Sequence, residues 1–191
     1  MFSNPNTDLN QKLNESINSS APLRQLFEEN NNLKTAINNY DYNSRELSLA
    51  SKGLSTPVLE LLIPILKHLE LETLDLDFNQ LQTLPESIGE LTSLTSLYLE
   101  SNQLQTLPES IGGLTNLVTL SLVNNQLETL PESIGELTSL NFLTIRNNRL
   151  QTLPESIGKL TSLTSLYLGS NKLQTLPESI GGLTNLETLN L

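Results

Sequence analysis

Apolar residues return at fixed positions along the chain from Leu71 onward, with polar positions between them. Each copy of the pattern opens with Leu-x-x-Leu-x-Leu, as in Leu94, Leu97 and Leu99, and the next copy follows 23 residues later. The copies begin at Leu71, Leu94, Leu117, Leu140, Leu163 and Leu186. A fixed period of this length is typical of a repeat architecture. One copy cannot bury its own leucines, so neighbouring copies must stack.

The first half of each copy predicts a short strand. Leu97 and Leu99 are two residues apart, so on an extended chain they point to one face, while Ser96 and Tyr98 point to solvent. An asparagine stands at the ninth position of every complete copy: Asn79, Asn102, Asn125, Asn148 and Asn171. We expect these side chains to form a ladder that bonds backbone groups left open where the chain leaves the strand. The alternative is an asparagine that only forms the turn.

The second half, Leu-x-x-Leu-Pro-Glu-Ser-Ile-Gly-x-Leu, predicts a short helical or 3₁₀ return. In one copy Pro108 favours a helical start, and Glu109 stands in the first turn, where a negative charge is favourable. Gly112 suits the exit from this turn. The inward anchors of the same copy are Leu104, Leu107, Ile111 and Leu114. Stacked copies would place their strands side by side in a parallel sheet.

These motifs resemble the leucine-rich repeat family, whose pattern is Leu-x-x-Leu-x-Leu-x-x-Asn-x-Leu. The second half, Leu-Pro-x-x-Ile-Gly-x-Leu, resembles the 23-residue subtype of bacterial and plant intracellular repeat proteins and of Roco-type repeat arms. The match covers residues 71–191, with five complete copies and a truncated sixth. The resemblance implies an α/β solenoid with the sheet on its concave face. It implies a binding arm and names no particular partner.

Residues 44–70 predict a degenerate first repeat that caps the solenoid, since terminal repeats are usually atypical. Lys52 stands where the frame places asparagine. A longer helix is expected over Val58–Leu69, and Pro64 should kink or split it.

Residues 1–43 are polar, contain 11 asparagines, and predict a helical or partly ordered leader. One helix is expected after Thr7, and a second after Ser20 that carries Leu23 and extends toward Ile37. A separate docking or export segment and disorder are the alternatives.

Composition narrows the class of protein. The net charge of −11 argues against general nucleic-acid binding. The chain has no cysteine and one histidine, His68. It shows no Ser–His–acid set, no glycine-rich phosphate loop and no metal-ligand spacing. The sequence therefore predicts a non-enzymatic protein without cofactor or metal.

The N-terminal residues lack the basic region and apolar core of a signal peptide. The longest apolar stretch, Val58–Leu69, is too short to span a membrane. We therefore expect a cytoplasmic protein, with export as an effector left open.

Outward strand positions differ most between copies, while the leucine frame hardly changes. Solvent-facing positions also drift without selection, so this pattern permits a binding face and does not require one. Tyrosine and arginine are common interface anchors, and Phe142, Arg146 and Tyr167 should lie on neighbouring strands. Phe78, at the eighth position, is expected to pack at the end of its strand. The predicted partner site on the concave face consists of Asp75, Asp77, Tyr98, Glu100, Phe142, Thr144, Arg146, Arg149, Tyr167 and Lys172.

Charge is uneven along the repeats. Residues 71–139 hold ten acids and no Lys or Arg, whereas residues 140–191 hold four basic residues and three acids. Such polarity would orient a partner, although a solvated surface is an equal alternative. Helix-dipole compensation and solubility explain the glutamates that follow the prolines: Glu86, Glu109, Glu132, Glu155 and Glu178. Asp75 and Asp77 fall short of a Ca²⁺ shell.

The leading hypothesis is a non-catalytic module that binds a protein partner through the concave face. The first alternative is the substrate-recognition arm of a larger multidomain enzyme or effector. The second is self-assembly through the C-terminal edge, where Leu186–Leu191 begins a strand that nothing polar covers.

Overall fold

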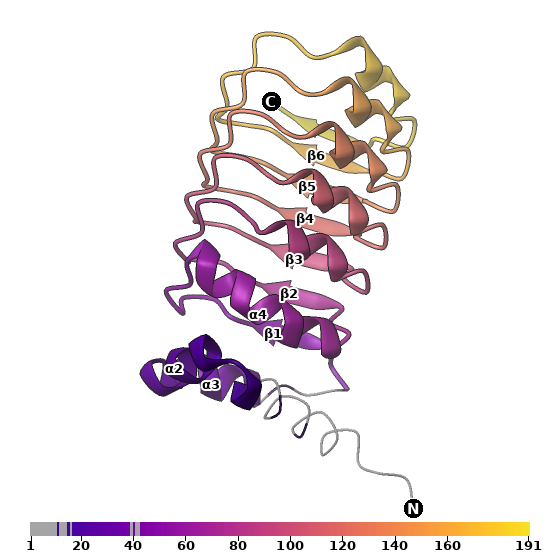
Figure 1. Ribbon diagram of the computed structural model, residues 1–191. Coiled ribbons are helices and arrows are strands. Elements are labelled where there is room, and N and C mark those ends of the chain that lie inside the picture. Colours follow the sequence, from indigo (N-terminus) through magenta and orange to yellow (C-terminus); the bar gives the residue numbers. More distant parts are fainter. Residues whose placement is uncertain (1–10, 12–14, 16, 39, 41–42) are drawn as a thin grey trace, which may run out of the picture.

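The computed structural model describes the whole chain except residues 1–10, 12–14, 16, 39 and 41–42 (Figure 1). Most of the helix expected after Thr7 lies outside the described residues. In the described part, seven short strands form one parallel sheet whose order follows the sequence. The strands are β1 (Glu46–Ser48), β2 (Thr73–Asp75), β3 (Ser96–Tyr98), β4 (Thr119–Ser121), β5 (Phe142–Thr144), β6 (Ser165–Tyr167) and β7 (Thr188–Asn190).

The sheet register follows the repeat period. Leu97 of β3 pairs with Leu120 of β4, and Leu120 pairs with Leu143 of β5, so each step is one copy long. All three leucines are completely buried. Leu47 of β1 pairs with Leu74 of β2, which places the longer first repeat in the same frame. The alternation of apolar and polar residues predicted this sheet correctly because each strand buries one face only.

Each 23-residue copy returns through a five-residue 3₁₀ helix on the side of the solenoid opposite the sheet, called the return side below (Figure 1). These helices are η1 (Glu86–Glu90), η2 (Glu109–Gly113), η3 (Glu132–Glu136), η4 (Glu155–Lys159) and η5 (Glu178–Gly182). A proline precedes each one with an extended backbone, as the Leu-Pro-Glu motif predicts. The strands occupy the concave face, in agreement with the expected solenoid.

Helix α4 (Thr56–His68) replaces the 3₁₀ return in the first repeat. Pro64 is exposed within α4, and the helix continues past it, so of the two expected effects of Pro64, a kink or a split, the split is wrong. The completely buried Leu62 and Leu66 anchor the helix on both sides of the proline. The loss of one backbone hydrogen bond on the solvent side is therefore tolerated.

Helices α2 (Ala21–Glu29) and α3 (Asn31–Asn38) extend the core beyond the first repeat. The Ser20 hydroxyl accepts a hydrogen bond from the backbone N–H of Leu23 at 3.4 Å, as expected of a helix cap. The expectation that one helix extends from Ser20 toward Ile37 is wrong, because the chain forms two helices there. Asn30 ends α2, and its side chain accepts a hydrogen bond from the Leu33 N–H at 2.9 Å, so it caps α3.

The asparagine ladder is present and connects each copy to the previous one. The Asn125 side-chain oxygen accepts a hydrogen bond from the Leu104 N–H at 3.0 Å. Its Nδ2 donates to the Leu99 carbonyl at 2.8 Å and to the Leu122 carbonyl at 3.2 Å. Asn102 and Asn148 repeat this arrangement. The first repeat has Lys52 in place of asparagine, and Asn79 bonds the backbone N–H groups of both Lys52 and Leu54.

A second ladder of hydrogen bonds runs along the return side. The Glu109 carboxylate accepts from the backbone N–H of Ser133 in the next copy at 3.1 Å, and Glu132 accepts from Ser156 at 3.2 Å. Glu86 accepts in the same way from Ser110 at 3.3 Å. Each of these carboxylates therefore satisfies a free donor at the start of the following 3₁₀ helix. The sequence interpretation placed the glutamates at helix starts and missed this partner.

Glycine on the return side has a packing role. An added Cβ at Gly112 would lie 2.8 Å from the carbonyl oxygen of Ser133 in the next copy. Gly112 also lies inside η2 and lacks the left-handed backbone of a helix exit, so the predicted exit role is wrong. The next copy approaches too closely to leave room for a side chain.

Candidate functional site

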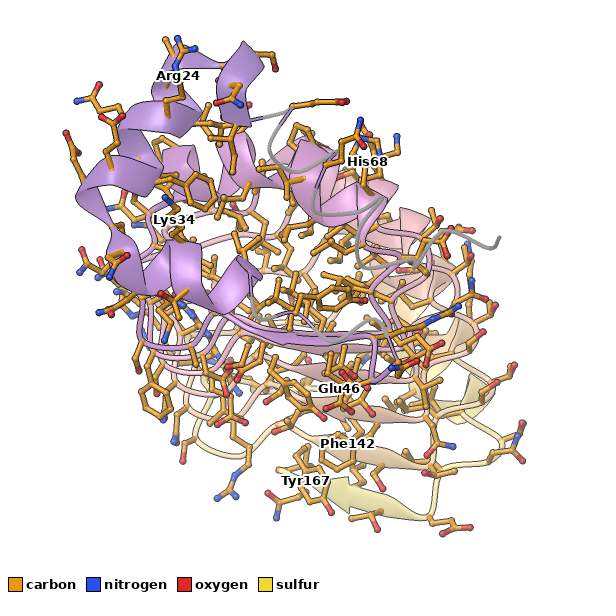
Figure 2. The ribbon with its side chains drawn as sticks, turned by 90° about the horizontal axis from the view of Figure 1, so that it is seen from below. Arg24, Lys34, Glu46, His68, Phe142 and Tyr167 are labelled. Atoms are coloured by element: carbon orange, nitrogen blue, oxygen red, sulfur yellow. The ribbon has the colours of Figure 1, made fainter. Side chains whose placement is uncertain are left out.

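The outward positions of the strands form rows that cross the concave face. Tyr98 of β3 pairs with Ser121 of β4, Ser121 pairs with Thr144 of β5, and Thr144 pairs with Tyr167 of β6. Two tyrosines therefore flank two small residues in one row. Figure 2 shows Phe142 and Tyr167 close together on the sheet side, away from His68 of α4.

An open hollow of about 420 Å³ lies along this row and is called the concave hollow below. The residues that line it are Tyr98, Glu100, Ser121, Val123, Phe142, Thr144, Arg146, Asn147 and Tyr167. The ring centroids of Phe142 and Tyr167 lie 5.4 Å apart at a tilt of 43°, an attractive arrangement for two aromatic rings. Ser121 and Thr144 are almost completely buried and form its floor.

The concave hollow contains six of the ten predicted site residues: Tyr98, Glu100, Phe142, Thr144, Arg146 and Tyr167. The other four, Asp75, Asp77, Arg149 and Lys172, are not among its lining residues. The sequence prediction missed Ser121, Val123 and Asn147. Ser121 and Val123 occupy the same repeat positions as Tyr98 and Glu100, one copy later. The strand register was therefore the signal that could have identified them.

Charged groups at the rim of the concave hollow differ in how they are bonded. The Glu100 carboxylate accepts a hydrogen bond from the Ser121 hydroxyl at 2.7 Å. Within the described residues, the Arg146 guanidinium makes no ion pair or hydrogen bond, and neither do the hydroxyls of Tyr98 and Tyr167. Among the described lining residues, Arg146 is therefore the charged group without a partner, and its guanidinium can only donate, whereas the tyrosine hydroxyls can donate or accept.

Phe78 does not pack at the end of β2, so that expectation is wrong. Its side chain is 62% exposed, and its backbone is left-handed with φ of 56°. Ser101, Asn124 and Asn147 share a positive φ at the equivalent position, where the chain turns out of the strand. A left-handed backbone costs a residue with a Cβ about 1–2 kcal/mol. Phe78 is thus both strained and exposed.

Asp77 belongs to an acidic group beside the concave hollow. Its Oδ1 accepts a hydrogen bond from the Glu100 N–H at 2.6 Å, and its own N–H donates to Asp75 Oδ1 at 3.0 Å. Burial raises the pKa of Asp77 from 3.8 to about 6. The bond from the Glu100 N–H lowers this pKa, while the charges of Asp75 and Glu100 raise it further.

We expect Asp77→Asn to stabilise the protein at pH 7.5 by about 1 kcal/mol, after allowance for solvent screening. Folded Asp77 binds its proton more tightly than the unfolded chain does. The stability that the protonated Asp77 side chain contributes to the folded state is therefore complete below about pH 4 and is lost as pH rises through 6. The difference between variant and parent should shrink between pH 7.5 and pH 5 in urea unfolding. Glu187→Gln, at an exposed carboxylate, is the control. A difference that does not change with pH would contradict the prediction.

Comparison with known families identifies the repeats. A family model described as leucine rich repeat matches residues 69–127, and one described as leucine-rich repeat region matches residues 119–191. The chain belongs to the leucine-rich repeat family. Leucine-rich repeats are typically non-catalytic modules that mediate protein–protein interaction.

Solved structures of leucine-rich repeat proteins are similar to this chain. A leucine-rich repeat protein of Leptospira interrogans is 29% identical with a TM-score of 0.54, over 83% of this chain and 57% of its own. The Arabidopsis receptor kinase HAESA, in complex with the peptide hormone IDA and the co-receptor SERK1, is 32% identical with a TM-score of 0.66, over 80% of this chain and 27% of its own. An internalin of Listeria monocytogenes is 27% identical with a TM-score of 0.61, over 75% of this chain and 40% of its own.

This leucine-rich repeat chain spans less than two thirds of each of these structures. No curated protein matches it significantly. Among the described residues, no helix is long and apolar enough to cross a membrane. The same residues contain no group of three or more His, Asp or Glu side chains that could hold a metal ion.

Proposed function

We propose that this chain is a non-catalytic module that binds a protein partner through the concave face of its sheet, with the concave hollow at the centre. The hollow is the main support for this proposal. It combines three aromatic rings, Tyr98, Phe142 and Tyr167, with the uncommitted Arg146, and such residues are the usual anchors of protein interfaces. A substrate-recognition arm of a larger enzyme or effector would use the same face.

The distribution of charge on the concave face supports an oriented partner. Asp75, Asp77 and Glu100 lie toward β2 and β3, whereas Arg146 follows β5. Arg149 and Lys172 continue the basic side and are exposed. A partner with a complementary charge gradient would dock in one direction and associate faster at low salt.

Affinity capture tests the proposal. The parent chain should retain a protein partner that the triple variant Tyr98→Ala, Phe142→Ala, Tyr167→Ala loses, while the variant keeps a cooperative thermal transition. The loss should be at least tenfold, since truncated anchor residues each cost more than about 1 kcal/mol. The control is Thr115→Ala, Thr138→Ala, Thr161→Ala, at exposed positions of the return side. A partner held equally by both triple variants would contradict concave-face binding.

A second candidate, association of copies through β7, is supported by exposed apolar surface. Leu189 is 41% exposed and Leu191 is 67% exposed beside the outer edge of the sheet. Unpaired strand edges with apolar side chains promote pairing between chains. Sedimentation velocity at rising concentration should show dimers of the 191-residue chain. A monomer at every concentration would exclude this role.

A further inference from the structure

We propose that the concave hollow binds an extended acidic segment of the partner. An apolar side chain of the segment enters between Tyr98 and Tyr167, and a neighbouring Asp or Glu carboxylate pairs with Arg146. This inference rests on the proposed concave-face function and specifies the chemistry of the partner.

The shape of the concave hollow fits a segment of chain. Tyr98 and Tyr167 stand three strands apart in one row, and parallel strands are about 4.8 Å apart. Their backbones are therefore roughly 14 Å apart, which is the span of about four residues of extended chain. Ser121 and Thr144 leave the space between the tyrosines open above a nearly buried floor. The hollow of about 420 Å³ is open to solvent, so an extended segment can lie across it.

The lining of the concave hollow favours an apolar group next to an anion. Phe142, Tyr167 and Val123 supply apolar surface. Among the described lining residues, Arg146 is the charged group without a hydrogen bond or ion pair, and the uncharged groups without a partner are the two tyrosine hydroxyls, the Thr144 hydroxyl and the Asn147 side-chain oxygen. A guanidinium has no acceptor, and its fork of N–H groups matches a carboxylate. Glu100 is bonded to Ser121, so its capacity to bind a cation is partly used.

Neighbouring residues place the carboxylate on the β5 and β6 side. Gly169 follows β6 at the repeat position of Arg146, and a side chain there would begin 3.6 Å from Arg146 Nε. Asn190 Oδ1 would be still closer, at 2.9 Å, so the missing side chain at position 169 leaves room for Asn190 as well as for the guanidinium. Arg149 and Lys172 extend the positive charge on this side, and Asp75 and Asp77 repel an acidic segment from the other.

A displayed library of random twelve-residue peptides, selected on the immobilised 191-residue chain, tests the inference. We expect the selected sequences to share a bulky apolar residue within two positions of Asp or Glu. Synthetic peptides are then titrated against the parent and three variants. Arg146→Gln should weaken binding at least tenfold. Thr144→Tyr should abolish binding, because it fills the floor with a residue that the same repeat position already carries in Tyr98 and Tyr167. Lys159→Gln, on the return side, should bind like the parent.

A double-mutant cycle identifies the ion pair. Replacement of the peptide carboxylate by its amide should weaken binding to the parent and cause little further loss in Arg146→Gln.

If the selected peptides lose binding to Thr144→Tyr but carry no Asp or Glu, the inference fails and the concave-face function stands. If binding is weakened by amidation of the peptide C-terminus and not by amidation of the side chain, the claim that a side-chain carboxylate pairs with Arg146 is wrong. If Arg146→Gln and Thr144→Tyr both bind the peptides as tightly as the parent does, the inference is overturned and another face is favoured. A failure to select any peptide overturns the extended segment, and the capture experiment then decides the function.

Discussion

Replacement of Gly135 by alanine is expected to lower the free energy of unfolding by about 3 kcal/mol, the upper end for an overpacked core position. Gly135 lies in η3, where an added Cβ would be 2.5 Å from the Ser156 carbonyl oxygen and 2.7 Å from Ser156 Cβ. Backbone atoms cannot rotate away from such a contact. The clash is relieved only if two copies move apart, and that movement opens the leucine core between them.

The same change at Gly181 is the matched control. Gly181 occupies the same position in η5, and a Cβ there would meet nothing within 4 Å. Alanine at this position should leave stability unchanged or raise it by about 0.5 kcal/mol, because it reduces the freedom of the unfolded chain. Urea unfolding followed by circular dichroism measures both variants. Equal stabilities for Gly135→Ala and Gly181→Ala would show that glycine serves the backbone conformation and not the contact between copies.

Replacement of Asn125 by alanine is expected to cost about 2–4 kcal/mol, since a buried donor without a partner alone costs about 1–3 kcal/mol. Asn125 is 7% exposed and bonds backbone groups of two successive copies. Among the described residues the Leu104 N–H has no other partner, so it would be left unpaired in the core. The Leu99 and Leu122 carbonyls keep one bond each, from Asn102 and Asn148.

Two further variants separate the ladder from simple loss of a side chain. Asn125→Asp keeps the acceptor for the Leu104 N–H but turns a carboxylate oxygen toward backbone carbonyls, so it should destabilise at least as strongly at pH 7. Asn116→Ala removes an exposed asparagine with one bond, to the Thr92 carbonyl, and should cost less than about 1 kcal/mol. Thermal unfolding measures the loss of stability in each of the three variants and ranks them. Similar costs for Asn116→Ala and Asn125→Ala would contradict a structural ladder.

Sequence patterns predicted some residues of the concave hollow and missed others. Alternation on the strands correctly predicted that Tyr98 and Phe142 share the outward face, because side-chain direction in a strand is set locally. The floor of the concave hollow was missed because Ser121 is unremarkable in the sequence. It matters only because the register places it between Tyr98 and Thr144.

The sequence by itself determined the solenoid, its parallel sheet, the position of the short returns and the asparagine ladder. These features depend on a period that repeats in every copy, so each copy supports the interpretation of the others. Tertiary structure alone decided how neighbouring copies meet. It paired Glu109 with the Ser133 backbone and required glycine at position 135, and it left Phe78 exposed. These outcomes depend on distances between residues about one repeat apart or on the direction of a turn, and neither is encoded in the spacing of leucines.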